Sequence, residues 1–128
     1  MADEILLAIS TFPDAELARR VSRQLVERNL AACANIGGAV ESIYHWEGKI
    51  EEAQETMVFF KTTRSRFSEF QDALRSMHPY EVPEIVALKI EGGLPPYLEW
   101  VASSCEAGES TIAASSAPSP ATAPGVVG

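Results

Sequence analysis

Three segments of the chain are apolar at consecutive positions, and this pattern restricts the possible folds more than any other feature of the sequence. The segments are Ile5–Ile9, Met57–Phe60 and Ile85–Leu88. Successive side chains of a β-strand point to opposite faces of the sheet, so each of these predicted strands requires burial on both faces. A sheet with one face in water would instead alternate apolar and polar residues. We therefore expect a sheet that is covered on both sides.

Two segments between the predicted strands have the apolar spacing of amphipathic helices. The first follows Asp14, a suitable N-cap, and carries its arginines on the side away from the apolar stripe. The second includes Phe67 to Met77 and ends at His78, because the residue before Pro79 is disfavoured in a helix. The apolar positions of the two helices are Leu17, Ala18, Val21, Leu25, Val26, Phe67, Phe70, Leu74 and Met77.

The complete order of predicted elements is β-α-β-β-α-β, followed by a short helix at residues 97–101. Residues 11–14 break the first strand, Gly37–Gly38 indicates a bulge or bend in the second, and residues 46–49 form a hairpin turn. This order is typical of the α+β ferredoxin-like sandwich, with an antiparallel four-stranded sheet and two helices on one face. The four predicted strands are residues 5–9, 32–46, 56–62 and 84–90.

Two helices cover only one face of such a sheet. The other face would be an exposed apolar patch larger than a monomer normally tolerates. Most soluble oligomers are assembled from identical chains, so another copy of this chain is the simplest cover. We therefore predict an obligate homo-oligomer.

Residues 1–105 are predicted to form one domain, and residues 106–128 a flexible tail rich in Ala, Ser and Pro. The 128-residue chain has a net charge of −8, which disfavours a nucleic-acid partner. No apolar stretch is long enough to span a membrane, and the acidic start is unlike a signal peptide. Cys33 and Cys105 have no metal-binding spacing, so we expect free thiols and a cytoplasmic protein.

The sequence contains no GxGxxG, P-loop, GxSxG or HExxH motif, and no catalytic group is predicted. The segment from His78 to Glu84 is therefore the strongest candidate for a functional site. It combines an imidazole, a phenol and two carboxylates, stiffened by two prolines, at the C-terminal end of a helix. These side chains suit copper or zinc. The alternative is structural: His78 caps helix carbonyls, Tyr80 packs and Glu84 is a surface residue. One His and one Glu are at most half of a metal site, because closed sites need about four ligands.

Six motifs occur in a characteristic order along the chain. They are Thr11-Phe12-Pro13-Asp14, Leu30-Ala31-Ala32-Cys33-Ala34-Asn35-Ile36, Ser42-Ile43-Tyr44-His45-Trp46-Glu47-Gly48-Lys49, Lys61-Thr62, His78-Pro79-Tyr80-Glu81-Val82-Pro83-Glu84-Ile85 and Tyr97-Leu98-Glu99-Trp100. In these motifs the chain resembles the CutA divalent-cation-tolerance family, from about Ile5 to Ala102. The resemblance implies a cytoplasmic homotrimer of ferredoxin-like protomers, similar in shape to the PII signalling proteins, with a role in tolerance to copper and other divalent cations.

The resemblance also implies copper ligands, of which His78 and Glu84 match the family pattern. That pattern can place a Cys just before the first motif, where this chain has Ser10, and a His before His78, where it has Met77. A hydroxyl is a poor copper ligand, and a thioether suits only Cu(I). We therefore predict that no cofactor is required and that Cu²⁺ or another divalent cation binds weakly, or at a site completed by a neighbouring subunit.

A cleft of the predicted trimer, lined by Lys61, His78, Tyr80 and Glu84, is expected to bind a metal ion or a small polar ligand. Two other functions stay open at this point. One is a PII-like trimer that senses a small ligand and contacts a partner protein. The other is an enzyme of acylphosphatase type, which is disfavoured because no glycine-rich anion loop follows the first predicted strand.

Overall fold

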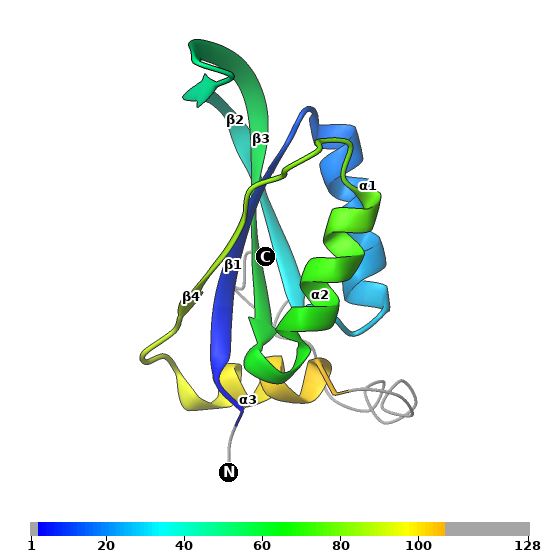
Figure 1. The fold of residues 1–128 in the computed structure, drawn as a ribbon. Coiled ribbons are helices and arrows are strands. Elements are labelled where there is room, and N and C mark those ends of the chain that lie inside the picture. Colours follow the sequence, from blue (N-terminus) through cyan, green and yellow to red (C-terminus); the bar gives the residue numbers. More distant parts are fainter. Residues whose placement is uncertain (1–2, 107–128) are drawn as a thin grey trace.

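An antiparallel sheet with the strand order β2-β3-β1-β4 forms one layer of the molecule, and two helices, α1 and α2, pack on one of its faces (Figure 1). The computed structural model describes residues 3–106, so the predicted tail lies outside the described residues except for Glu106. The elements are β1 (Ile5–Phe12), α1 (Ala15–Glu27), β2 (Cys33–Trp46), β3 (Lys49–Thr63), α2 (Arg64–Met77), β4 (Ile85–Lys89) and α3 (Pro95–Ser104).

Strand β1 is the centre of the sheet, because it pairs with β3 along one edge and with β4 along the other. Both pairings are antiparallel, and β2 is added on the far side of β3. This topology is the predicted ferredoxin-like one, and the order β-α-β-β-α-β with a terminal helix is confirmed.

The core lies between the sheet and the two helices. Phe12 and Phe60 point into it from the strands, and Phe70 meets Phe60 edge to face with ring centroids 5.1 Å apart. All three rings are fully buried, and burial of each stabilises the fold by roughly 1.5–3 kcal/mol. The helices contribute the apolar positions that the sequence predicted, including Val21, Leu25 and Leu74.

The opposite face of the sheet is also apolar, and helices α1 and α2 do not cover it, while α3 packs only against its Ile5 end. Cross-strand pairing places Leu7 beside Leu88 and Ile9 between Phe59 and Val86 on this side. Val86 and Leu88 are 47% and 57% exposed, whereas Ala8, which faces the helices between Leu7 and Ile9 on β1, is fully buried. We call these five side chains the open face. Its composition confirms that the strands are apolar on both sides.

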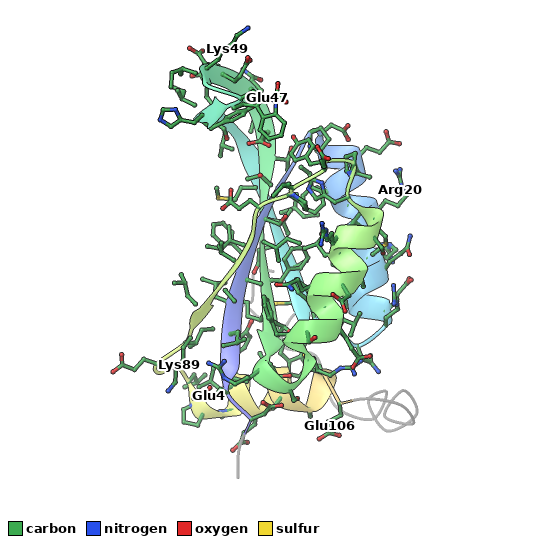
Figure 2. All side chains as sticks on the ribbon, viewed as in Figure 1. Glu4, Arg20, Glu47, Lys49, Lys89 and Glu106 are labelled. Atoms are coloured by element: carbon green, nitrogen blue, oxygen red, sulfur yellow. The ribbon has the colours of Figure 1, made fainter. Side chains whose placement is uncertain are left out.

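Strands β2 and β3 continue beyond the sheet as a two-stranded arm (Figure 1). Figure 2 shows Glu47 and Lys49 at its tip, far from Glu4 and Lys89 at the α3 end. The turn is tight because Glu47 and Gly48 adopt left-handed backbone angles, with φ of 50° and 78°. A register shift between Ile36 and Ala39 marks the predicted bulge at Gly37–Gly38.

Several predicted boundaries were wrong, in each case because tertiary pairing overrides local signals. The first strand does not break at residues 11–14 but continues to Phe12, which pairs with Thr56. The third strand begins at Lys49 rather than Thr56, since residues 49–55, four of which are charged, pair with the other half of the arm. Charged exposed residues form a strand here because their backbone groups are paired.

The remaining differences concern element ends. Helix α2 begins at Arg64, and α3 spans ten residues rather than the predicted one or two turns of 97–101. Pro95 and Pro96 occupy the first turn of α3, where a missing N–H costs no hydrogen bond. The last strand is one residue shorter than predicted at each end, from Ile85 to Lys89.

Asp14 provides a test of the helix boundary. Its side chain accepts a 2.8 Å hydrogen bond from the backbone N–H of Leu17, as expected for an N-cap. Asp14→Ala should lower the free energy of unfolding by about 1 kcal/mol in denaturant titrations. Asp14→Asn retains an acceptor and should lose much less. Equal losses in the two variants would contradict the capping role.

Candidate functional site

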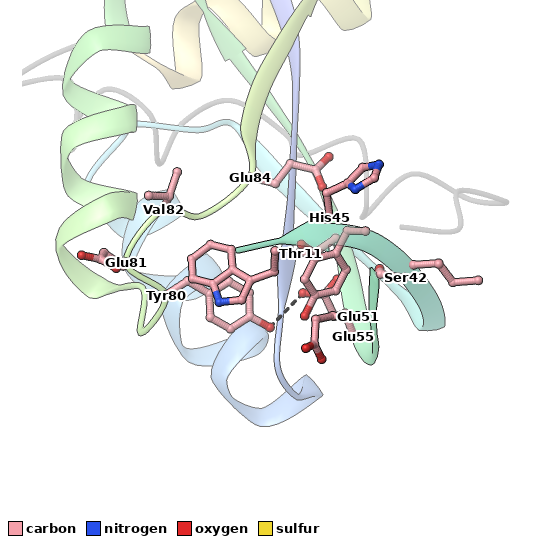
Figure 3. Close-up of a pocket in the computed structure, with 12 residues that line it drawn as sticks. Thr11, Ser42, His45, Glu51, Glu55, Tyr80, Glu81, Val82 and Glu84 are labelled. Atoms are coloured by element: carbon pink, nitrogen blue, oxygen red, sulfur yellow. Dashed lines mark hydrogen bonds between the residues drawn. The ribbon is translucent and has the colours of Figure 1, made fainter. Parts of the chain in front are cut away.

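The arm and the segment 79–84, which connects α2 to β4, border an open cavity of about 850 Å³ on the surface of the protomer (Figure 3). Strand β2 contributes the aromatic side chains Tyr44 and Trp46, and strand β3 contributes Glu51 and Glu55. Tyr80, Glu81, Val82 and Glu84 line the other side. The volume lies in the usual range of small-molecule sites, roughly 300–1,000 Å³.

Tyr80 joins the two walls of this cavity. Its hydroxyl donates a 2.8 Å hydrogen bond to Oε2 of Glu55, drawn as a dashed line in Figure 3. Burial, and then the adjacent Glu55 carboxylate, raise the pKa of Tyr80 well above its ordinary value. The phenol therefore stays protonated and acts as a donor that orients Glu55.

His78 lies beneath Tyr80 and is buried, with its ring between Tyr80 and Phe12 at centroid distances of 4.6 Å and 4.8 Å. Its Nε2 is 2.7 Å from the carbonyl oxygen of Thr11, and its Nδ1 accepts a 3.2 Å hydrogen bond from the backbone N–H of Tyr80. A carbonyl can only accept, so the proton is on Nε2. Both ring nitrogens of His78 are thus occupied by backbone groups.

The other predicted metal ligands lie in different environments. Ser10 is fully buried, and its hydroxyl has no hydrogen-bond partner in the part of the chain that the structure describes. Met77, the last residue of α2, is partly buried and packs against the core, whereas Glu84 is exposed and lines the cavity. Within residues 3–106, no three His, Cys, Asp or Glu side chains come together as they would to hold a metal ion. The described part of one protomer therefore does not contain a closed metal site.

Lys61 lies outside the cavity lining, in the middle of the sheet. It pairs with Cys33 on one side and with Leu7 on the other, and its Nζ donates a 2.7 Å hydrogen bond to Oδ1 of Asn35. The structure thus brings Tyr80, Glu84 and His78 into one region and leaves Lys61 apart from them within a single protomer. The predicted cleft containing all four requires a second protomer.

The sequence analysis missed the part of the cavity that belongs to the arm. Glu51 and Glu55 were not singled out, because a pair of surface carboxylates has no motif. The available signal was the hairpin itself: its alternation places Tyr44 directly opposite Glu51. Once the third strand is extended back to Lys49, these residues necessarily share one side.

Two thiol environments complete the description. The Sγ of Cys33 is 3.6 Å from the hydroxyl of Tyr97, while burial raises the pKa of the Cys105 thiol to about 11. Both cysteines are free, as predicted. At neutral pH Cys105 is protonated, so it is a structural rather than a reactive thiol.

A comparison with protein families matches residues 6–104 of this chain to the family described as "CutA1 divalent ion tolerance protein". The chain belongs to this family. The match covers more than half of the chain and confirms the resemblance drawn from the six motifs.

Individual family members are similar over the same region. The Thermus thermophilus "Divalent-cation tolerance protein CutA" is 43% identical over 99 residues, which are 77% of this chain and 94% of that protein. The Xenopus laevis "Protein CutA homolog" is 48% identical over 94 residues, or 73% of this chain. This chain spans only 62% of the Xenopus protein and 53% of the "Protein CutA" of Mus musculus.

Solved structures of family members have the same fold. The Thermus thermophilus Cut A1 structure superposes with a TM-score of 0.78 at 40% identity, covering 80% of this chain and 99% of that one. The Oryza sativa CutA1 structure gives 0.79 at 34% identity, covering 82% and 96%. Among the described residues of this chain, no helix is long and apolar enough to cross a membrane.

The bonds of His78 lead to a prediction about stability. His78→Phe keeps an aromatic ring between Phe12 and Tyr80 but leaves the Thr11 carbonyl and the Tyr80 N–H unpaired. Because each buried unpaired group costs about 1–3 kcal/mol, we expect the free energy of unfolding to fall by roughly 2–4 kcal/mol.

The matched control is His45→Phe, since His45 is exposed on the arm. It should change the free energy of unfolding by less than about 0.5 kcal/mol. Chemical denaturation followed by circular dichroism measures both variants. Similar values for the two would show that the hydrogen bonds of His78 are not structural.

Proposed function

We propose that this chain is a divalent-cation tolerance protein that works as a homotrimer. Membership of the CutA1 family supports the functional class, and relatives such as the Thermus thermophilus protein carry that name. The open face is the observation that supports the assembly. The comparisons give the PII-like alternative no added support.

The open face requires a cover that the described part of the protomer does not provide. Leu7, Ile9 and Phe59 are partly buried, while Val86 and Leu88 are about half exposed at the edge strand β4. Full burial of an exposed apolar side chain contributes roughly 1.5–3 kcal/mol, and these partly buried side chains gain a fraction of that each. Packing three sheets around a common axis, as the family resemblance implies, buries all these side chains at once.

We further propose that divalent cations bind weakly, with Glu84 as the accessible ligand and His78 as its partner. Nδ1 of His78 becomes available only if the Tyr80 backbone N–H gives up its bond, which costs about 1–3 kcal/mol for a buried donor. Ser10 and Met77 replace stronger copper ligands of the family pattern. Donors from a neighbouring subunit would therefore have to complete the site, and no resident cofactor is required.

The remaining parts of the proposal concern location and chemistry. Two free cysteines fit a reducing compartment, so we place the protein in the cytoplasm. The ring nitrogens of His78 bond to backbone groups rather than to a nucleophile, which supports a binding role rather than catalysis. A net charge of −8 is unfavourable for nucleic-acid partners.

The trimer can be tested on the open face. The wild-type protein should sediment with three times the 13.8 kDa mass of the chain. The double variant Val86→Glu/Leu88→Glu brings charges into the proposed interface and should sediment as a monomer or precipitate. Arg20→Glu, on the exposed surface of α1, should leave the mass unchanged. A wild-type mass of one chain would refute the assembly.

The metal site can be tested by thermal shift with copper, comparing each variant with its own metal-free melting temperature. Binding to the native state raises that temperature by mass action. The small shift expected for the wild type should disappear in Glu84→Ala and persist in Glu81→Ala, which removes a neighbouring carboxylate that is not one of the copper-ligand positions of the family. Restoring the family ligands with Ser10→Cys/Met77→His should enlarge the shift. An unchanged shift in Glu84→Ala would contradict the assignment.

A further inference from the structure

Residues 3 and 4, which precede β1, contact the first turn of α2 through several hydrogen bonds. Oδ1 of Asp3 accepts a 3.2 Å hydrogen bond from the backbone N–H of Ser65, and its Oδ2 accepts one from the hydroxyl of the same serine. The backbone N–H of Arg64 donates a 2.9 Å hydrogen bond to the carbonyl oxygen of Glu4. The start of α2 is thus attached to a segment that lies 60 residues earlier in the sequence.

This attachment gives α2 a cap that its own N-cap residue does not provide. The first four N–H groups of a helix have no partner within the helix. Thr63 occupies the N-cap position, but its side chain makes no capping hydrogen bond, and its hydroxyl lies 3.3 Å from that of Ser65. A carboxylate at this end of a helix also interacts favourably with the helix dipole. Asp3 therefore caps α2 in place of Thr63.

Glu4 extends the attachment to β4. Its Oε1 accepts a hydrogen bond from Nε of Arg64, and its Oε2 is 3.0 Å from Nζ of Lys89, the last residue of β4 (Figure 2). One carboxylate therefore pairs with the first residue of α2 and the last residue of β4. We call Asp3 and Glu4, with their partners Arg64, Ser65 and Lys89, the clasp.

The clasp lies on the helix side of the sheet. Lys89 pairs with Leu6, and Glu4 is two residues before Leu6, so all three share one side of the strands. Ala8, the next residue on that side, faces the helices and is fully buried. The clasp is therefore separate from the open face that the proposed trimer covers.

The charges of the clasp make it sensitive to acid. Hydrogen bonds from Lys89 and then from Arg64 hold the pKa of Glu4 below its ordinary value. Such a carboxylate contributes stability above its ordinary pKa and loses that contribution as the pH falls through the lowered value. Asp3 also interacts with the Cys105 thiol after α3, but burial raises the pKa of that thiol to about 11 and keeps it neutral.

We propose that the clasp is an acid-sensitive strap, which detaches residues 3 and 4 from α2 and β4 while the core stays folded. Protonation of both carboxylates removes the charges that face Arg64 and Lys89. These two side chains are 60% and 59% exposed, so water replaces the lost contacts at little cost. The core between the sheet and the helices is held by apolar burial, which does not depend on pH.

Hydrogen exchange at the Ser65 amide of the full-length protein, followed by NMR, tests the strap. This N–H has no partner within α2, so Asp3 should be the group that protects it. Asp3→Ala should speed its exchange at neutral pH by roughly 5-fold, the factor that corresponds to a lost helix cap. Asp3→Asn keeps an acceptor and should retain most of the protection. Equal exchange in the wild type and Asp3→Ala would overturn the proposal.

The acid response is measured at the same amide, relative to its intrinsic exchange rate at each pH. Protection of Ser65 in the wild type should fall between about pH 5 and pH 3, while the amides of β1 stay protected. In Asp3→Asn, which has no titrating group at this position, protection should vary less with pH. A parallel loss at Ser65 and along β1 would indicate global unfolding and would refute a local strap.

Glu4→Gln tests the contribution of the pairs with Arg64 and Lys89. It should speed Ser65 exchange roughly 2- to 5-fold, as expected for exposed ion pairs, and 1 M NaCl should act in the same direction on the wild type. Glu69→Gln is the matched control, because Glu69 pairs with Arg66 at 2.7 Å on the same helix but is not part of the clasp. Equal exchange in these two variants would contradict the role of Glu4. The outcome is independent of the trimer and metal proposals, neither of which involves the clasp.

Discussion

Apolar side chains on both faces of the central strand β1 are the constraint on which the structure depends. Because β1 is paired along both edges, its backbone groups are satisfied within the sheet, and only its two faces need cover. Helices α1 and α2 cover one face, with Phe12 and Phe60 at the centre of the core. The open face then makes association with another copy the simplest physical completion of the fold.

His78 connects that core to the functional region. Its ring stacks on Phe12, and its two nitrogens bind the Thr11 carbonyl and the Tyr80 N–H. His78 therefore holds three segments together: the end of α2, the end of β1 and the start of residues 79–84. Tyr80 in turn orients Glu55 of the arm. The residue that most resembles a metal ligand in the sequence thus has a structural role in the protomer, which supports weak metal affinity.

The sequence predicted the elements well where burial determines them. Apolar spacing located both long helices, and Asp14 and Gly48 marked a cap and a turn that the structure confirms. The sequence did not predict a strand at Lys49–Glu55, because that half of the arm is largely charged and exposed. It forms a strand only because its backbone pairs with β2. The arm side of the cavity was missed for the same reason: Glu51 can be assigned to the cavity only once its pairing with Tyr44 across the hairpin is known.

The sequence by itself determined the family, the order of the elements and the requirement that the sheet be covered on both sides. These properties follow from local patterns of burial, capping and turn chemistry, which are encoded in consecutive residues. Only the tertiary structure decided that both nitrogens of His78 are occupied, that Lys61 lies apart from Tyr80, and that an acidic and aromatic cavity forms beside the arm. Such features depend on contacts between groups that are distant in the sequence. The hydrogen bond between His78 and Thr11, which are 67 residues apart, produces no periodic pattern that the sequence could show.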